Sequence, residues 1–230
     1  MEGLLLIDKP PGITSHDAVD VVRRHAGTRA VGHAGTLDPF ATGLLIIGIN
    51  KATKWLTKLI GLDKTYEAGL LLGAESDTFD KDGVVTPWPF PVQQPQDKAQ
   101  VETSLTHFRG TFEQRAPLYS AKKVHGKKLY ELARLHRADE AMRPTKRITV
   151  HELTLTRYAY PELDLHVHCS SGTYIRSLAD DLGRTLNTGA YLHTLRRTMI
   201  GTYAVNDACP LDTLTLELIK ERLIQKNEVS

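Results

Sequence analysis

Residues 32–44, with the sequence GHAGTLDPFATGL, place three glycines around one histidine and one carboxylate and lead directly into the apolar run at residues 44–47. The glycines allow positive φ angles and a close approach of the backbone to a ligand, and Pro39 restricts the chain just after Asp38. A lone aspartate in a loop most often caps a helix or forms an Asx-turn. A tight loop that opens onto a buried strand, however, is typical of segments that display functional side chains. We therefore interpret this segment as a loop that forms a functional site.

Length and composition indicate an ordinary globular chain. Its 230 residues are enough to bury one large core, and no apolar run approaches the roughly 18–20 residues of a membrane span. The N-terminus lacks the basic region of a signal peptide. Cys169 and Cys209 are far apart and outside any CxxC pattern, which argues against a disulfide framework or a zinc ribbon. These features predict a cytoplasmic protein.

The net charge of +2 hides an uneven distribution, because residues 109–150 carry eleven basic and four acidic side chains. A basic segment of this kind is suited to a phosphate backbone, and counterion release would then make binding fall steeply with salt. A solvated helix face is the alternative interpretation of the same charges. The basic and aromatic residues in question are Tyr119, Lys122, Lys123, Lys127, Lys128, Tyr130, Arg134 and Arg137.

Hydrophobic periodicity predicts alternating strands and helices without repeats. Strands are expected at residues 4–8, 44–49, 64–72, 110–114, 148–158, 163–169 and 202–205. Helices are expected at residues 14–26, 52–60, 97–108, 127–137 and 173–186, and in a final segment capped by Asp212. Because hairpins and helices both connect the strands, the pattern favours an α+β fold with a mixed sheet.

Sequence patterns do not decide the roles of single residues outside the glycine-rich loop. Tyr66 lies on an expected strand, where a tyrosine usually packs half-buried, and its phenol matters only if it contacts Asp38. His166 and His168 share one strand face without a third ligand, so a metal site is not favoured. Ser120 lacks a nearby base, which argues against a serine nucleophile.

Residues 169–176 form an expected strand-to-helix turn whose serine and glycine amides could bind an anion. Arg176 follows on the side of the helix opposite the apolar residues. It could form an i,i+4 pair with Asp180, or it could clamp a carboxylate or phosphate through two hydrogen bonds. Spacing alone does not choose between these two roles.

Six motifs in order resemble the bacterial tRNA pseudouridine-55 synthases, the TruB family, over residues 3–203. The segment LIDKPPGITS resembles the opening motif of the family, and the glycine-rich loop resembles its catalytic motif. The motifs lie at residues 6–15, 32–44, 64–66, 119–122, 169–176 and 195–197.

The resemblance implies a catalytic role for three of these residues. Asp38 would be the catalytic aspartate. Tyr66 would stack against the target uracil and take part in proton transfer, and Arg176 would pair with Asp38. The implied reaction breaks the C1′–N1 bond of uridine 55 in the tRNA T-loop and rejoins the ring through C5.

Four further residues are expected to bind the substrate. His33 would enter the RNA loop where the target base leaves the stack, and Leu195 would line the base pocket. Lys9 would support the site, and Tyr174 would contact the substrate. The expected partner is the T-arm of tRNA, with no metal, no organic cofactor and no membrane, and the protein is expected to be a monomer.

The same resemblance implies a pseudouridine-synthase fold, with a mixed, mainly antiparallel central sheet flanked by helices and an active-site cleft across it. Residues 1–230 are expected to form one catalytic domain, with the basic RNA-binding segment at about residues 109–150. The small β-rich RNA-binding domain of longer family members is expected to be absent. Asn50 stands where the family commonly has glycine, and the turn should survive because asparagine tolerates the left-handed region.

Two other classes of function stay open. Asp38 with a second carboxylate such as Asp80 could release the base by hydrolysis, as a glycosylase does. A noncatalytic tRNA-folding factor would instead use only the basic surface. Free uracil among the products would identify the first class, and effects preserved in Asp38→Asn would identify the second.

Overall fold

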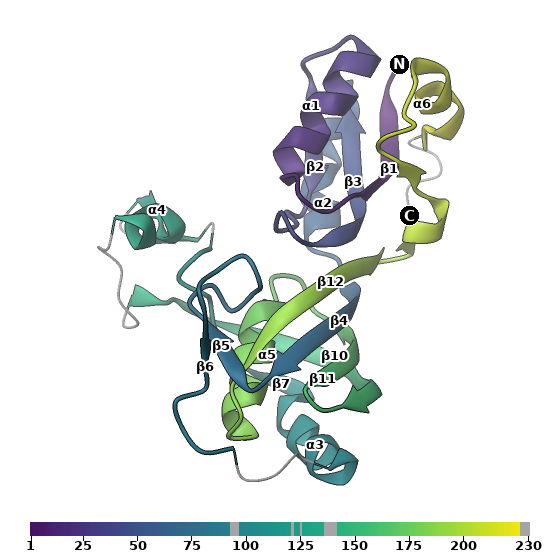
Figure 1. Ribbon diagram of the computed structural model, residues 1–230. Helices are drawn as coiled ribbons and strands as arrows, with labels where there is room; N and C mark the ends of the chain where they lie inside the picture. Colours follow the sequence, from purple (N-terminus) through teal and green to yellow (C-terminus); the bar gives the residue numbers. More distant parts are fainter. Residues whose placement is uncertain (93–96, 121, 125, 136–141, 226–230) are drawn as a thin grey trace. The chain divides into compact units, whose positions relative to one another are not determined.

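The computed structural model describes residues 1–92, 97–120, 122–124, 126–135 and 142–225 (Figure 1). The chain divides into two compact units that alternate along the sequence. The terminal unit comprises Met1–Tyr66 and Leu195–Ser230, and the central unit comprises Glu67–Thr194. Both boundaries fall inside strands, because β4 (Lys64–Leu72) and β12 (Ala190–Ile200) run from one unit into the other along the chain.

The terminal unit is built on a short sheet in which β3 pairs antiparallel with β1 and β2 and parallel with the end of β12. A parallel bridge adds β14 to β1. The strands of this unit, besides the end of β12, are β1 (Gly3–Lys9), β2 (Val31–Ala34), β3 (Thr42–Ile49), β13 (Tyr203–Ala204) and β14 (Cys209–Pro210). Its helices are α1 (Ser15–Ala26), the 3-10 helix η1 (Asn50–Lys54), α2 (Leu56–Ile60), the 3-10 helix η4 (Val205–Asp207) and α6 (Leu216–Arg222).

Both faces of β1 and β3 are buried, which explains why these strands are continuous apolar runs rather than alternating ones. Leu5, Ile7 and alternate residues of β3 pack with residues of α1 and α6 on one face. Leu4, Leu6 and the other set of β3 residues pack with α2 on the opposite face. The two strands therefore form a rigid layer between helices, and the loops at their ends are held in place by it.

The sequence predicted α1 with its boundaries. Thr14 is the N-cap: its hydroxyl accepts a hydrogen bond from the Asp17 amide at 3.1 Å. The Asp17 carboxylate in turn accepts one from the Thr14 amide at 2.8 Å, and this reciprocal pair is a capping box. Gly27 ends the helix with φ +62, a conformation that glycine adopts without strain.

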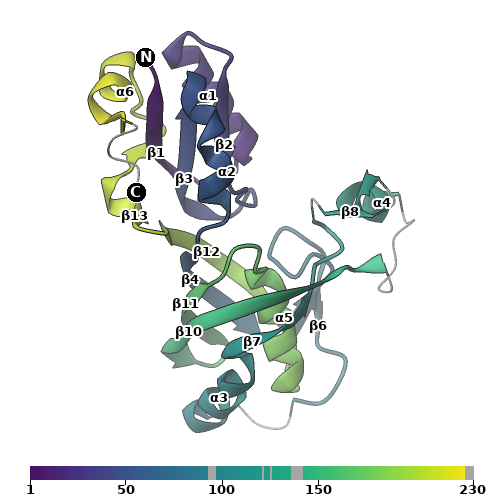
Figure 2. The ribbon, with the colours of Figure 1, turned by 180° about the vertical axis from the view of Figure 1, so that it is seen from behind.

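The central unit contains an antiparallel sheet in the order β4-β11-β10-β7. In Figure 2 the long strand β10 crosses this unit beside β11 and β7, and α5 and α3 lie along the same sheet. Besides parts of β4 and β12, the strands are β5 (Ala74–Ser76), β6 (Val85–Pro87), β7 (Gly110–Arg115), β8 (Lys123–Val124), β9 (Lys127–Lys128), β10 (Thr145–Ala159) and β11 (Glu162–Cys169). The helices are α3 (Lys98–Leu105), the 3-10 helix η2 (Thr106–Phe108), α4 (Leu129–Arg134) and α5 (Ile175–Thr185).

The strand pairings confirm the predicted α+β class with a mixed, mainly antiparallel sheet. Parallel pairing occurs between β1 and β14 and between β3 and β12, whereas β1–β3, β10–β11 and β10–β7 are antiparallel. Asn50 has φ +55, so the predicted left-handed turn at this position is confirmed. None of the helices in the described ranges is long and apolar enough to cross a membrane.

The prediction that residues 32–44 form one loop is wrong at both ends. Val31–Ala34 form strand β2 and pair with Ile46–Ile49, so His33 lies on a strand opposite Ile47. Strand β3 already begins at Thr42. The loop proper is residues 35–41, because the backbone of the flanking residues is used in ladder hydrogen bonds.

Two helix predictions are also corrected. The basic helix expected at 127–137 begins at Leu129, since Lys127 and Lys128 pair with residues 123–124 in a hairpin whose turn contains Gly126 at φ +80. Arg137 lies outside the described residues. The last helix is capped by Thr215 rather than Asp212, because the Thr215 hydroxyl accepts a hydrogen bond from the Leu218 amide at 3.1 Å.

The segment predicted as one helix at residues 52–60 is split. It consists of η1 and α2, with Trp55 between them. The Trp55 amide bonds to the Ala52 carbonyl at 3.0 Å, which is the i→i+3 geometry of a 3-10 turn. Leu56 and Leu59 of α2 are buried.

Candidate active site

The loop that carries Asp38 is fixed on both sides of the carboxylate. The Ser15 hydroxyl, at the start of α1, accepts a hydrogen bond from the Leu37 amide at 2.8 Å and donates one to the Leu37 carbonyl at 3.1 Å. The Asp38 carbonyl accepts from the Ala41 amide at 3.1 Å, which closes a turn directly after the carboxylate. The Asp38 side chain itself is half-buried. This loop therefore displays its carboxylate on a backbone that has little freedom to move.

Lys9 lies beneath this loop at the end of β1. Its side chain is enclosed, with 0% of the residue exposed. The ammonium donates to the Pro10 and Ile13 carbonyls at 2.8 Å each and to the Pro39 carbonyl at 3.2 Å. Burial lowers the pKa of Lys9 to about 8, and the nearby Asp38 carboxylate opposes this shift. Lys9 thus connects the first strand to the residue that follows Asp38.

Arg197 is a second buried cation beside the same loop, with 1% of the residue exposed. Its Nε donates to the Leu44 carbonyl at 2.8 Å, and a terminal nitrogen donates to the Gly35 carbonyl at 3.0 Å. Burial lowers the pKa of Arg197, while the interactions with Tyr66 and the charge of Asp38 oppose the shift. Arg197 is therefore an electrostatic neighbour of both the tyrosine and the carboxylate.

The position of Arg197 depends on a close approach of two strands. Gly43 on β3 pairs with Arg197 on β12 and has φ +100. A Cβ at Gly43 would lie 2.2 Å from the Arg197 carbonyl oxygen, a distance that no side chain can occupy. Only glycine at this position allows the two strands to bring the guanidinium to the base of the loop.

His33 and Leu195 belong to the same unit. His33 is half-buried on β2, and burial lowers its pKa, with the charge of Arg197 acting in the same direction and a backbone hydrogen bond at Gly35 opposing it. A neutral imidazole is thereby favoured at neutral pH. Leu195 is 7% exposed, and its carbonyl accepts a hydrogen bond from the Thr42 hydroxyl at 3.4 Å.

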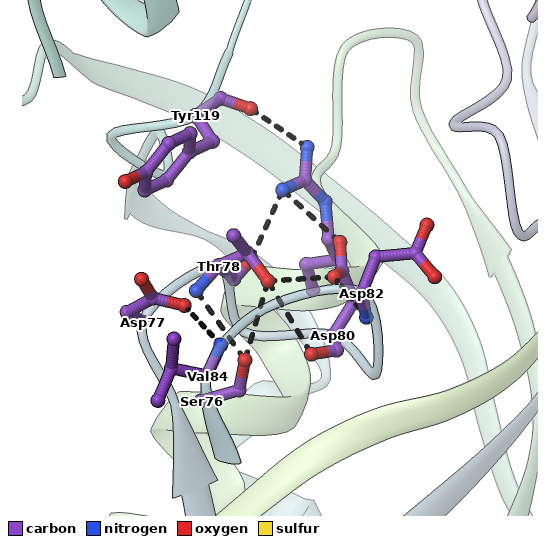
Figure 3. A network of polar contacts seen from close by, with 8 residues as sticks. Ser76, Asp77, Thr78, Asp80, Asp82, Val84 and Tyr119 are labelled. Atoms are coloured by element: carbon purple, nitrogen blue, oxygen red, sulfur yellow. Dashed lines mark hydrogen bonds and ion pairs between the residues drawn. The ribbon is translucent and has the colours of Figure 1, made fainter. Parts of the chain in front are cut away.

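Arg176 lies in the central unit and contacts Thr78 and Asp80, which belong to the polar network that Figure 3 shows. Its guanidinium is 3.3 Å from the Asp80 carboxylate, and both side chains are 6% exposed. It donates to the Thr78 carbonyl and to the Tyr119 carbonyl, each at 3.0 Å. Arg176 is buried, as are most residues of α5, so this helix is covered on more than the side of its apolar residues.

The acidic turn is organised around this arginine. The Asp80 carboxylate accepts hydrogen bonds from the Thr78 hydroxyl at 2.6 Å and from the Asp82 amide at 3.0 Å. On α5 the Asp180 carboxylate accepts a hydrogen bond from Arg184 at 2.9 Å. Within this unit Arg176 thus forms an ion pair with Asp80, whereas Asp180 accepts from Arg184. The clamp through two hydrogen bonds stays a prediction.

Comparisons with known proteins bear on what these residues do. A family model described as TruB family pseudouridylate synthase (N terminal domain) matches residues 23–175. A second, described as tRNA pseudouridylate synthase B C-terminal domain, matches residues 176–228. The chain belongs to the TruB family of pseudouridylate synthases. The resemblance inferred from the six motifs is therefore confirmed.

Individual TruB-family relatives match most of the chain. A tRNA pseudouridine synthase B from Azoarcus sp. (strain BH72) is 45% identical over 215 residues, which are 93% of this chain and 70% of the relative. Another, from Opitutus terrae, is 43% identical over 228 residues, covering 97% of this chain and 92% of the relative.

Solved structures agree on the fold. A chain from a Cbf5–Nop10–Gar1 complex has a TM-score of 0.71 and 26% identity, and covers 97% of this chain. A chain from an H/ACA ribonucleoprotein bound to a substrate RNA containing 2′-deoxyuridine has a TM-score of 0.69 at 24% identity, which speaks for the fold alone. This chain spans 57% and 56% of those two solved chains. The pseudouridine-synthase fold is confirmed.

Within this TruB-family chain, Tyr174 is held through its backbone. The buried Gln114 side chain accepts a hydrogen bond from the Tyr174 amide at 2.8 Å and donates one to the Tyr174 carbonyl at 3.0 Å. Both bonds come from one planar amide, so the residue before α5 has a fixed main-chain direction. The substrate-binding role of Tyr174 stays a prediction.

The basic segment reaches the turn before α5. The Lys146 ammonium donates to the Ser171 carbonyl at 2.6 Å. Burial lowers the pKa of Lys146, and the charge of Lys122 acts in the same direction. Two basic side chains therefore lie near the serine- and glycine-rich turn that the sequence predicted as an anion-binding element, and that role is not tested by these contacts.

A separate cavity of about 370 Å³ opens in the central unit. It is lined by charged residues of both signs: Glu113, Arg115, Arg143, Asp180, Asp181 and Arg184. Burial and the neighbouring Asp180 raise the pKa of Asp181, and three guanidiniums oppose that shift. None of the predicted site residues lines this cavity, and its charges compensate one another, so we interpret it as an ion-pair network.

The structure thus brings part of the predicted site together. Lys9, Asp38 and Tyr66 lie in the terminal unit and share Arg197 as a neighbour. The Asp38–Arg176 pair joins residues of different units and stays a prediction. Across the described part of the chain, no group of three or more histidine, cysteine, aspartate or glutamate side chains is placed to hold a metal ion.

Sequence reasoning assigned no role to two of the interactions that shape the site. Arg197 was only part of a matched motif, and half of the residues at positions 195–200 are polar or charged, so no local apolar pattern indicated its burial. The contact of Ser15 with Leu37 spans 22 positions, and no local pattern indicates it. The predicted start of this helix at residue 14 is confirmed, because Thr14 is its N-cap.

Proposed function

We propose that this chain converts uridine 55 in the T-loop of tRNA to pseudouridine, with Asp38 as the catalytic carboxylate. The observation that carries the proposal is the loop of residues 35–41, whose main chain is held on both sides of Asp38 beside two buried cations. Its relatives named tRNA pseudouridine synthase B support tRNA as the substrate class. The isomerisation detaches the base at C1′–N1 and reattaches the ring at C5.

The reaction requires strict positioning of both fragments. A base that is detached and returned to the same sugar must stay within reacting distance, and fixed main-chain anchors supply such positioning. The nucleotide must first leave the stack, which costs a few kcal/mol. His33, half-buried and with a lowered pKa, suits the position that the base vacates because a neutral ring can stack there.

Asp38 must act as an anion close to an apolar base. Burial alone favours the neutral carboxylic acid, whereas nearby positive charge favours the carboxylate. Lys9 and Arg197 supply that charge from within the terminal unit. We assign Tyr66 to base stacking and proton transfer and Leu195 to the wall of the base pocket.

Arg176 is assigned to Asp38 as an ion-pair partner when the substrate is bound, and Tyr174 to contact with the RNA. Arg176 is preorganised for this task, because two carbonyl acceptors and Asp80 fix its guanidinium. A bidentate group can serve more than one acceptor at a time.

The test is tritium release from 5-tritiated uridine in a T-arm minihelix. The wild type should release tritium from position 55 only, and Asp38→Asn should lose the release while still binding the minihelix. Asp212→Asn is the matched control, since Asp212 is an exposed aspartate outside the site. Release that persists in Asp38→Asn refutes the assignment of the carboxylate, and release at another position refutes the assignment of the target.

The same experiment distinguishes the alternatives. Free uracil among the products would identify a base-releasing glycosylase. Effects on tRNA folding that are preserved in Asp38→Asn, with no tritium release from the wild type, would identify a noncatalytic factor.

Arg176 is tested by Arg176→Ala in single-turnover experiments. Turnover should be abolished while minihelix binding stays largely intact. Because the substitution also leaves the buried Asp80 carboxylate without its cation, it should destabilise the fold, so rates are compared at a temperature at which circular dichroism reports full folding. Arg184→Ala is the control on the same helix, since the Arg184 side chain is 52% exposed. An unchanged single-turnover rate in folded Arg176→Ala refutes the pairing.

A further inference from the structure

Ser15 is the first residue of α1, and 2% of it is exposed. Its neighbour Thr14 caps the helix, whereas the Ser15 hydroxyl contacts the loop of residues 35–41, the Asp38 loop. It accepts a hydrogen bond from the Leu37 amide at 2.8 Å and donates one to the Leu37 carbonyl at 3.1 Å. Serine is mostly exposed in proteins. A buried hydroxyl that bonds a residue 22 positions away therefore has a role outside its own helix.

The two bonds act on the two peptide units that flank Leu37. The amide belongs to the unit between residues 36 and 37, and the carbonyl belongs to the unit between Leu37 and Asp38. Because a peptide unit is planar, a bond to its carbonyl oxygen restricts the orientation of the whole unit. The Ser15 hydroxyl thus sets the direction in which the main chain enters Asp38.

The segment that contains Ser15 also holds the chain on the other side of Asp38. The Gly12 amide donates to the Pro39 carbonyl at 2.9 Å, and the Lys9 ammonium donates to the same oxygen at 3.2 Å. The ring of Pro39 adds its own restriction, because it fixes φ. Residues 9–15 therefore bond the main chain both before and after the carboxylate.

Hydrogen bonds and apolar packing restrict the Asp38 loop in different ways. Leu37 and Phe40 are 4% and 5% exposed, so the loop is attached to the core on either side of Asp38. Apolar burial is non-directional, whereas a hydrogen bond requires a defined angle. Packing can therefore place the loop, but the bonds from Ser15 orient the peptide unit that precedes the carboxylate.

We propose that Ser15 is a positioning residue for the isomerisation, which directs the Asp38 carboxylate through the main chain of Leu37. This inference rests on the proposed function and adds to it a group that acts on the carboxylate indirectly. Both hydrogen bonds of the hydroxyl end on the protein main chain, so Ser15 does not need to touch the RNA. Its removal should slow the reaction without weakening the binding of RNA.

The contact is tested first by hydrogen exchange of the Leu37 amide in the protein without RNA. Ser15→Ala should speed this exchange by at least about 10-fold, because the amide loses its acceptor. Ser15→Thr keeps the hydroxyl and should keep the protection. Thr188→Val is the control for a buried hydroxyl elsewhere, since Thr188 is 0% exposed and donates to the Gly189 carbonyl at 3.0 Å. Equal exchange of the Leu37 amide in the wild type and Ser15→Ala would overturn the contact.

The positioning role is tested by single-turnover rates and minihelix affinity in folded variants. Ser15→Ala should lower the rate by about 10–100-fold, with an affinity within about 3-fold of the wild type, because small displacements of reacting groups are costly. Ser15→Thr should stay within about 3-fold of the wild-type rate, even though its extra methyl group destabilises the fold. Thr188→Val should keep the wild-type rate. An equally slow Ser15→Thr, or a loss of affinity in place of rate in Ser15→Ala, would overturn the role.

Failure of this inference and failure of the proposed function give different results. If the wild type releases no tritium, the proposed function fails and the positioning role fails with it, while exchange of the Leu37 amide still decides whether the contact exists. If the wild type is active and folded Ser15→Ala keeps its rate, only the positioning role is refuted. If Ser15→Ala does not fold, Ser15→Cys replaces it, because a thiol is a weak hydrogen-bonding group of similar size. Its rate should fall, and a wild-type rate would refute the role.

Discussion

Lys9→Met removes an ammonium that is 0% exposed and donates to three main-chain carbonyls around the Asp38 loop. Methionine has nearly the same shape and no charge, so the variant isolates the charge and its hydrogen bonds. Because burial lowers the pKa of Lys9 from 10.5 to about 8, we expect the difference in unfolding free energy between the wild type and Lys9→Met to depend on pH.

The sign follows from proton binding. The folded protein releases the Lys9 proton near pH 8, whereas the unfolded chain holds it up to about 10.5. Between these values the unfolded chain binds more protons, so the free energy of unfolding rises with pH. The full contribution is about 3 kcal/mol, of which about 1.3 kcal/mol is gained between pH 7 and pH 9.

Urea denaturation of the wild type and Lys9→Met at pH 7, 8 and 9 measures this effect. The difference in unfolding free energy should shift in favour of the wild type by about 1 kcal/mol over that range. Taking the difference between the two proteins at each pH cancels the contributions of other groups that titrate in the same range. Lys51→Met is the control, because the Lys51 side chain is 82% exposed and should give a difference that stays flat.

Parallel stability curves for the wild type and Lys9→Met would refute the reasoning, since Lys9 would then bind its proton equally in both states. A difference that shifts in favour of the variant as pH rises would refute it more strongly. That result would mean that Asp38 and the carbonyl acceptors outweigh the burial of the ammonium.

Two further predictions concern the backbone around the loop. Gly43→Ala should destabilise the protein by at least about 3 kcal/mol, because its Cβ would lie 2.2 Å from the Arg197 carbonyl oxygen. The control Gly27→Ala, at φ +62 with no atom within 4 Å of the new Cβ, should cost only about 1 kcal/mol. Similar losses of unfolding free energy in the two variants, measured by chemical denaturation, would contradict the close approach at Gly43. Ser15→Ala should cost about 1–3 kcal/mol because the buried Leu37 amide loses its acceptor, and an unchanged denaturation midpoint would show that this amide finds another partner.

Much of the fold could be predicted from local patterns. The strands β1 and β3 were found because nearly uninterrupted apolar residues leave little choice of structure, and their burial on both faces explains the lack of alternation. Helix α1 was found with its ends, because Thr14 and Gly27 carry cap signals that act within the helix itself.

Strand β12 could not be found in this way. In a half-buried strand, buried apolar residues alternate with exposed polar ones, but in β12 the charged Arg197 occupies a buried position where an apolar residue is expected. Strand β2 was missed for a related reason: Gly32 and His33 resemble loop residues, and only pairing with β3 makes them a strand. Tertiary contacts overrode local preference at both places.

The candidate site, like the fold, could be predicted from the sequence only in part. Asp38 could be proposed from the glycine-rich loop, and Lys9 from the resemblance of residues 6–15 to the opening motif of the TruB family. The partner of Arg176 within its unit could not, since Asp80 is about a hundred positions away and the nearer Asp180 offers the same chemistry. Spacing on a helix predicts neighbours on that helix only.

The two cations beside Asp38 act differently from an ordinary salt bridge. Lys9 donates to the Pro39 carbonyl, and Arg197 donates to the Gly35 carbonyl, so these hydrogen bonds fix the main chain on either side of the aspartate. Their charges still reach the carboxylate through space. A carboxylate stabilised by charge and held by its backbone can keep an oxygen directed at a substrate, which a carboxylate enclosed by its own ion pairs cannot. This requirement explains why residues at positions 9, 38 and 197, on three distant segments, have to meet at one loop.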